Sequence, residues 1–141
     1  MNRALKTMIV DDEEVSADLL EIMLNRVGIR EILTATNGPK AVENFESGLK
    51  NGAPFALVFL DILMPGMDGQ EALKHMRAAE KEAGIASDDR AVIIMTTALT
   101  NADAMIEALF DGDCNDYLVK PIGPAYLGEM LTNKGFIARD Q

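Results

Sequence analysis

Residues 58–69 read VFLDILMPGMDG: an apolar run that ends at a single carboxylate, Asp61, and is then broken by Pro65, Gly66 and Gly69. Apolar runs that do not alternate with polar residues are typical of strands covered on both faces, as in parallel sheets. Proline and glycine favour tight turns. In open parallel sheets, ligands bind beyond the carboxyl ends of the strands. The stretch therefore predicts a buried parallel strand that presents Asp61 at a ligand-binding edge.

Other apolar runs repeat this pattern along the chain. The five expected strands cover residues 7–10, 32–35, 55–60, 91–95 and 117–119. Segments of helical period lie between and after them, at residues 15–27, 41–48, 72–84, 102–110 and 125–133. In the first helix the apolar stripe runs from Val15 through Leu19 to Val27, and Gly28 follows where a helix commonly ends. Five alternations of strand and helix predict the α/β class, with a doubly wound parallel sheet and helices on both faces.

Composition narrows the class of protein further. The 141 residues suit one domain, and 13 Lys and Arg against 23 Asp and Glu give a formal charge of −10. Such a surface repels phosphate backbones and anionic lipids, so we expect no direct nucleic-acid binding. No apolar run reaches the roughly 20 residues that span a bilayer. With a single cysteine, Cys114, the chain has no internal disulfide, and we expect a cytoplasmic location without membrane insertion.

Polar residues follow four of the five predicted strands. Asp11 and Asp12 come after the first strand, Asp61 after the third, Thr96 and Thr97 after the fourth, and Lys120 after the fifth. Each one alone is explained by a helix cap or a turn, but their arrival together at one edge is not. Three carboxylates are hard oxygen ligands that suit Mg²⁺ better than Zn²⁺. A lysine among them suits a phosphate group that shares the site.

Four motifs occur in order at matching spacings: MIVDDEE at 8–14, LDILMPGMDG at 60–69, IIMTTA at 93–98 and YLVKPI at 117–122. With them the chain resembles the receiver domains of two-component response regulators, from about Lys6 to Leu131. The resemblance implies a receiver domain over residues 1–131, a flavodoxin-like strand order of 2-1-3-4-5, and a short tail over residues 132–141 without an output domain.

The resemblance also implies a role for each residue of the acidic cluster. Asp61 matches the aspartate that accepts a phosphoryl group from the phosphohistidine of a sensor histidine kinase or histidine phosphotransfer protein. Asp12, Asp61 and the backbone carbonyl of Leu63 match the Mg²⁺ ligands, and Asp11 assists directly or through water. Lys120 matches the lysine that pairs first with the acceptor and then with its phosphate.

Two further residues match positions that respond to phosphorylation. Thr97 matches the hydroxyl that moves to contact the phosphate, because the family has a small residue next and Ala98 follows. Thr96 is then expected to be the last strand residue. Tyr117 matches the aromatic switch. The peptide bond between Lys120 and Pro121 is expected to be cis, as is common in the family.

The implied function is a signalling switch rather than an enzyme with turnover, although the domain assists its own phosphorylation and dephosphorylation. Its downstream protein partner is expected to bind the face made by the fourth helix, fifth strand and fifth helix. Leu63 and Leu99 follow Asp61 and Thr97 by two residues, where the family modulates hydrolysis of the aspartyl phosphate. Because both are apolar, we expect water to be hindered and the phosphorylated state to be long-lived.

Three alternatives remain to be weighed. A receiver-fold module that binds partners without phosphorylation is left open by the sequence. A magnesium-dependent phosphatase of the haloacid dehalogenase kind uses an aspartyl phosphate but needs a second aspartate where Leu63 stands. A flavodoxin-like FMN carrier shares the fold, but Asp11 and Asp12 would repel the FMN phosphate.

Overall fold

The computed structural model describes residues 5–98 and 113–138. Its sheet has five parallel strands in the order β2-β1-β3-β4-β5, which confirms the predicted doubly wound α/β fold and its strand order. The strands are β1 (Thr7–Val10), β2 (Ile32–Ala35), β3 (Leu57–Asp61), β4 (Val92–Thr97) and β5 (Asp116–Val119).

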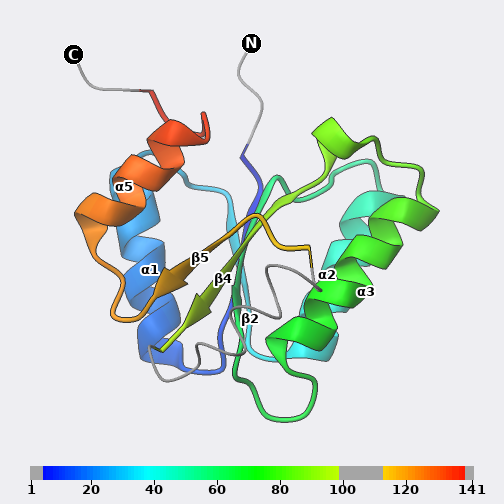
Figure 1. Cartoon of the computed structure of the whole chain (residues 1–141), viewed down its shortest axis with the longest axis horizontal. Helices are drawn as coiled ribbons and strands as arrows, with labels where there is room; N and C mark the ends of the chain where they lie inside the picture. Colours follow the sequence, from blue (N-terminus) through cyan, green and yellow to red (C-terminus); the bar gives the residue numbers. More distant parts are fainter. Residues whose placement is uncertain (1–4, 99–112, 139–141) are drawn as a thin grey trace.

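Helices cover both faces of this sheet. The described α-helices are α1 (Glu14–Arg26), α2 (Gly38–Lys50), α3 (Gly69–Glu82) and α5 (Pro124–Asn133), and a short 3₁₀ helix spans Ser87–Asp89. In Figure 1, α1 and α5 lie on one side of the strands, and α2 and α3 lie on the other. The predicted fourth helix, at residues 102–110, lies outside the described residues.

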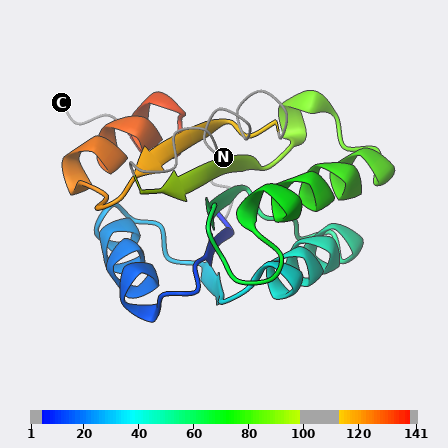
Figure 2. The same cartoon turned by 60° about the horizontal axis from the view of Figure 1, so that its bottom comes forward.

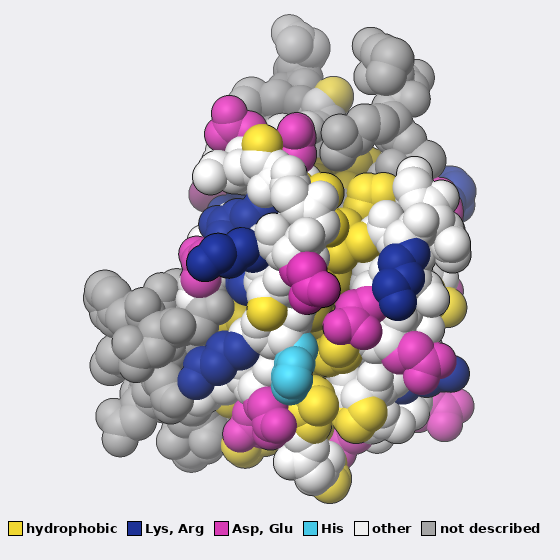
Figure 3. All heavy atoms as spheres, turned by 90° about the vertical axis from the view of Figure 1, so that its right-hand side faces the viewer, with side chains coloured by type: hydrophobic (Ala, Val, Ile, Leu, Met, Phe, Trp, Pro, Cys, Tyr) yellow, Lys and Arg dark blue, Asp and Glu magenta, His cyan; other side chains and the backbone are white. Residues whose placement is uncertain are grey.

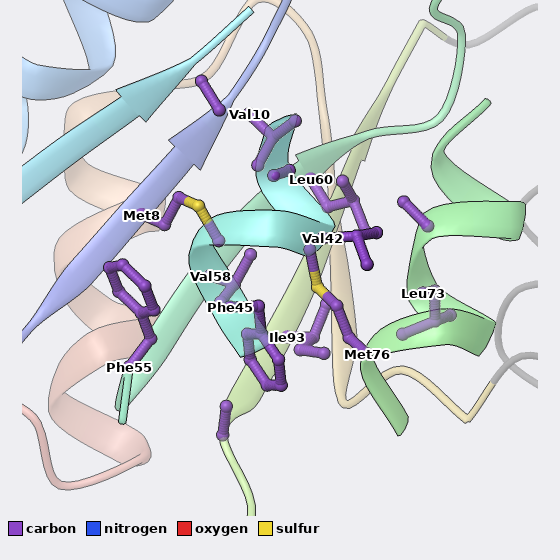
Figure 4. Close-up of a cluster of buried hydrophobic side chains, with 14 of the residues drawn as sticks. Met8, Val10, Val42, Phe45, Phe55, Val58, Leu60, Leu73, Met76 and Ile93 are labelled. Atoms are coloured by element: carbon purple, nitrogen blue, oxygen red, sulfur yellow. The ribbon is translucent and has the colours of Figure 1, made fainter. Parts of the chain in front are cut away.

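The side-chain alternation of the strands divides the core into two layers. Met8 and Val10 of β1 point toward α2 and α3, whereas Ile9 points toward α1 and α5. The first layer also contains Phe45 of α2 and Met76 of α3 (Figure 4). Every residue of β1 and β3 is buried, which explains why these strands read as unbroken apolar runs.

Several predicted boundaries differ from the structure by one to three residues. Strand β3 begins at Leu57 rather than Phe55, although Phe55 is also buried, in the core layer on the α2 and α3 side. Thr97, not Thr96, is the last residue of β4. Helix α2 continues past Gly48 to Lys50, and Gly52, with a φ of 71°, follows its cap. A glycine inside a helix does not end it when tertiary packing supports the next turn.

The apolar stripe predicted for the first helix is only partly correct. Gly28 does follow the helix with a φ of 97°, as predicted. However, α1 buries Ala17, Leu20 and Leu24, whereas Val15 and Leu19 are 73% and 56% exposed. The helix is thus rotated so that part of its apolar surface faces solvent.

The remaining surface carries mixed charges. Figure 3 views the α2 and α3 side, where acidic and basic side chains border a seam of hydrophobic ones. His75, the single histidine of the chain, is exposed on α3. Within the two described ranges, no helix is both long and apolar enough to cross a membrane.

Candidate functional site

The carboxyl ends of the parallel strands bring the predicted acidic residues together. Asp11 and Asp12 follow β1, and Asp61 ends the neighbouring strand β3. Carboxylate oxygens of all three lie within 4.8 Å of one another. Asp11 and Asp61 are each only 5% exposed, whereas Asp12 is exposed. The cluster therefore has two buried carboxylates and one that faces solvent.

Lys120, which follows β5, joins the two buried carboxylates. Its Nζ lies 2.9 Å from Oδ2 of Asp11 and 3.2 Å from Oδ2 of Asp61. The Lys120–Pro121 peptide bond is cis, as the resemblance implied. One ammonium between two buried carboxylates offsets their mutual repulsion, which would otherwise favour protonation of one of them.

This arrangement changes the acidity of the groups. Burial raises the pKa of Asp61 to about 6, the charge of Lys120 opposes this rise, and the charge of Asp11 adds to it. Burial by itself would lower the pKa of Lys120, but its hydrogen bond to Asp11 and the charges of both carboxylates raise it. At neutral pH, Asp61 is therefore an ionised carboxylate that its surroundings solvate poorly.

Local backbone groups orient the same carboxylates. The backbone N–H of Leu63 donates to Oδ1 of Asp61 at 3.2 Å, and the N–H of Glu13 donates to Oδ1 of Asp11 at 2.9 Å. Gly69 lies so close to the backbone of Asp61 that a Cβ there would collide with the Asp61 carbonyl. Its N–H donates to the Ile62 carbonyl at 2.9 Å. The glycine after the acceptor strand is thus needed for a close backbone approach.

The other predicted residues lie around this cluster. Thr97 is buried at the end of β4, and its hydroxyl donates to the carbonyl of Ala98 at 3.1 Å rather than to a carboxylate. Leu63 is 58% exposed. Tyr117 is half-buried on β5 and packs against the core layer beneath α2 and α3. Leu99 lies outside the described residues.

Glu13 is a further neighbour of the site that the sequence did not indicate. One of its carboxylate oxygens lies 3.9 Å from Nζ of Lys120, although the side chain is exposed. The only sequence signal was its position directly after Asp11 and Asp12, which also suits the first turn of a helix.

The donor set fits a hard divalent cation. The cluster offers carboxylate oxygens alone, and one of its members is open to solvent, so a bound ion could keep several waters. Mg²⁺ prefers this combination of few carboxylates and retained water. The residues present thus fit the magnesium that the resemblance implied.

Residues 7–132 match the sequence profile of the response regulator receiver domain. The chain belongs to this family. A receiver domain is a signalling domain of two-component and phosphorelay systems, which agrees with the predicted class of function. Membership decides against the two alternatives drawn from other families, the FMN carrier and the haloacid dehalogenase-like phosphatase.

Individual relatives support the same conclusion. The receiver domain is 31% identical to hybrid signal transduction histidine kinase L of Dictyostelium discoideum over 130 residues, which are 92% of this chain but 7% of the kinase. The chain thus spans a small part of that relative.

Solved structures of receiver domains also match. The Ssk1 receiver of Saccharomyces cerevisiae, solved in complex with the histidine phosphotransfer protein Ypd1, is similar with a TM-score of 0.76 and 31% identity, covering 92% of this chain and 87% of that one. The receiver of sensor histidine kinase PA1611 from Pseudomonas aeruginosa, solved with magnesium in its active site cleft, has a TM-score of 0.75 and 27% identity, covering 93% and 97%.

Proposed function

We propose that this receiver domain accepts a phosphoryl group on Asp61 from the phosphohistidine of a sensor histidine kinase or histidine phosphotransfer protein, and that phosphorylation changes its binding to a downstream protein. The observation that supports this most directly is the ammonium of Lys120 between Asp11 and Asp61. The bridge holds a buried carboxylate ionised and supplies positive charge where a phosphoryl group would arrive.

The transfer needs no general base, because the nucleophile is already a carboxylate. An oxygen of Asp61 forms a bond to phosphorus as the bond from phosphorus to the histidine nitrogen breaks. The electron pair of that bond stays on the imidazole. Lys120 offsets the repulsion between the anionic acceptor and the anionic donor, and it remains beside the aspartyl phosphate that results.

Asp12, Asp61 and the carbonyl of Leu63 would hold Mg²⁺, with Asp11 assisting directly or through water. The ion would supply further positive charge to the phosphoryl oxygens. The carboxylate cluster of this chain and the magnesium described for the PA1611 receiver support this assignment.

The switch requires a phosphate that interacts better with the active arrangement than with the resting one. Thr97 suits this role because its hydroxyl donates to the neighbouring carbonyl of Ala98, and a phosphate oxygen could replace that acceptor. Tyr117 is half-buried, which allows an inward and an outward ring position. Tyr126 of α5 is 61% exposed on the face proposed for the downstream protein. The fourth helix of that face lies outside the described residues.

The surface beside the acceptor supports a protein donor. Val15 and Leu19 of α1 are exposed, and a cavity of about 130 Å³ between α1 and Pro121 has Asp11 and Lys120 among its lining residues. An apolar surface next to a charged site suits a docked protein that must reach Asp61. The complex of the Ssk1 receiver with Ypd1 supports a phosphotransfer protein as the donor class.

Incubation with acetyl phosphate and Mg²⁺, followed by intact mass measurement, tests the chemistry. We expect one phosphate adduct on the wild type, and none on Asp61→Asn or in the presence of a chelator. Asp88→Asn, which removes an exposed carboxylate on the 3₁₀ helix, serves as the control and should be phosphorylated normally. An adduct that persists in Asp61→Asn would refute the assignment.

A second measurement addresses the switch itself. Pull-down from the source cell with and without beryllofluoride, a mimic of the phosphoryl group, should capture different proteins. Identical capture in both conditions would favour the alternative module that binds partners without phosphorylation.

A further inference from the structure

Gly38, the first residue of α2, lies directly against the loop that carries the acceptor. A Cβ at this position would come within 2.7 Å of the carbonyl oxygen of Met67 and within 2.9 Å of its Cβ and Cγ. Gly38 is buried, and the loop between β3 and α3 lies beside the start of α2 in both Figure 1 and Figure 2. Two of the three colliding atoms are the backbone oxygen and Cβ, so rotation of the Met67 side chain would not relieve the collision.

Helix α2 is poorly able to yield at this point. Asn37 caps it by accepting a hydrogen bond from the N–H of Lys40 at 2.8 Å, and Val42 and Phe45 are buried in the core. The chain that leads into α2 is held as well, because the N–H of Asp11 donates to the carbonyl of Ala35 at 3.1 Å. A side chain at position 38 would therefore displace Met67 rather than the helix.

The loop is also tied at both of its ends. Gly69 donates to the Ile62 carbonyl at 2.9 Å, and the side chain of Asp68 caps α3 by accepting from the N–H of Glu71 at 2.9 Å. Because Ile62 and Asp68 are held by these hydrogen bonds, a displacement of Met67 must change the backbone of residues 63–66. That stretch includes the Leu63 carbonyl, the proposed metal ligand.

We propose that Gly38 is a positioning residue for the acceptor loop: the absence of its side chain lets α2 support Met67 and so places the Leu63 carbonyl for Mg²⁺. This inference rests on the proposed function. Gly38 has no left-handed φ, so an alanine there would meet a collision and no backbone strain. Alanine normally stabilises a helix relative to glycine. Weaker Mg²⁺ binding by Gly38→Ala would therefore report the contact with Met67.

The test compares Gly38→Ala with Gly128→Ala. Gly128 is also a helical glycine, on α5, but a Cβ placed there meets no heavy atom within 4 Å among the described residues outside its own helix. We expect Gly38→Ala to weaken Mg²⁺ binding about tenfold, the size typical of lost support around a metal ligand, and Gly128→Ala to leave it unchanged. Amide NMR spectra without metal should show shifts over residues 63–68 in Gly38→Ala only.

A rescue variant separates positioning from general damage. Gly38→Ala/Met67→Gly removes two of the three colliding atoms, so we expect the alanine to reduce Mg²⁺ affinity less in the Met67→Gly background than in the wild-type background. If Gly38→Ala does not fold, Met67→Ala tests the same contact from the loop side and should also weaken Mg²⁺ binding.

The outcomes distinguish this inference from the proposed function. A folded Gly38→Ala that binds Mg²⁺ within about twofold of the wild type would overturn the role of Gly38, as would an unchanged Met67→Ala where that variant replaces it. A wild type that neither binds Mg²⁺ nor takes up phosphate would instead refute the proposed function.

Discussion

Asp61 combines two properties that oppose each other. Its side chain is almost fully buried, which disfavours charge, and yet its chemistry as an acceptor requires the charged form. Lys120 resolves this only in part, because the pKa of Asp61 remains raised from 3.8 to about 6 by burial. The residue proposed to accept the phosphoryl group therefore destabilises the fold that presents it.

Replacement of Asp61 should stabilise the metal-free protein. Because the pKa is higher in the folded than in the unfolded chain, the folded state holds the extra proton between about pH 4 and 6, and stability falls as the pH rises through that window. Above about pH 6 the full cost of burying the ionised carboxylate is present. We expect Asp61→Asn to raise the free energy of unfolding by about 1–3 kcal/mol at pH 7 and by little below pH 4.

Urea unfolding at both pH values without Mg²⁺ measures this effect. Asp88→Asn removes an exposed carboxylate and should change stability by less than about 0.5 kcal/mol. An Asp61→Asn protein no more stable than the wild type at pH 7 would contradict the prediction.

Leu63 offers a second test at the level of one residue. It follows the acceptor by two positions and is exposed, so it can limit the approach of water to an aspartyl phosphate. We expect Leu63→Asn/Leu99→Glu to shorten the lifetime of the phosphorylated state about tenfold, timed after loading with acetyl phosphate.

Leu33→Asn is a suitable control for the loss of an exposed leucine. Leu33 is 44% exposed on the edge strand β2, and its replacement should leave the lifetime as it is. Equal lifetimes of the wild type and the double variant would remove the idea of hindered hydrolysis.

Helix α3 is joined to the segments just before β4 and β5 by an ion pair whose side chains are largely buried. Arg77 is 9% exposed and Glu80 is 2% exposed, and they meet at 2.7 Å. The other oxygen of Glu80 accepts from the N–H of Ala91 at 2.7 Å. Arg77 also donates to the Asp113 carbonyl and to Oδ1 of Asn115. Nearly every polar atom of the pair has a hydrogen-bond partner, so the pair holds α3 and these two segments in one arrangement.

Loss of one partner should thus be costly. Glu80→Ala leaves Arg77 without its carboxylate and Ala91 without its acceptor, and we expect a loss of about 3–5 kcal/mol in the free energy of unfolding. Urea unfolding measures it. Glu82→Ala on the same helix removes an exposed carboxylate and should change stability by less than about 0.5 kcal/mol. A loss in Glu80→Ala as small as that of the control would show that the pair contributes little.

At the scale of the whole molecule, the site joins loops that follow different strands. Asp11 and Lys120 are 109 residues apart in the chain but share a hydrogen bond. Such a cluster exists only in the folded protein, so an ion that binds it stabilises the entire domain.

Magnesium should therefore raise the global stability. At a concentration one hundred times its Kd, we expect Mg²⁺ to increase the free energy of unfolding by about 2.7 kcal/mol. Asp12→Asn should lose most of this increase, and a chelator should reverse it. Thermal unfolding with and without Mg²⁺ provides the measurement. A similar increase in Asp12→Asn would place the ion elsewhere.

The sequence alone determined the type and order of the described elements, because apolar periodicity, glycine positions and turn residues act locally along the chain. It also determined which end of the sheet collects Asp11, Asp12, Asp61 and Lys120, since parallel strands share one carboxyl edge. The motifs added the strand order and the family.

Only the tertiary structure decided which apolar and charged side chains are buried. Val15 and Leu19 belong to a helical apolar stripe yet face solvent. Arg77 and Glu80 are oppositely charged residues three positions apart on a helix, as in many surface pairs, yet their side chains are only 9% and 2% exposed. The close approach of Gly38 to Met67 could not be predicted from the sequence either, because the two residues belong to segments that are separated along the chain. The physical reason is that local sequence sets backbone conformation, whereas burial depends on how distant elements come to rest against one another.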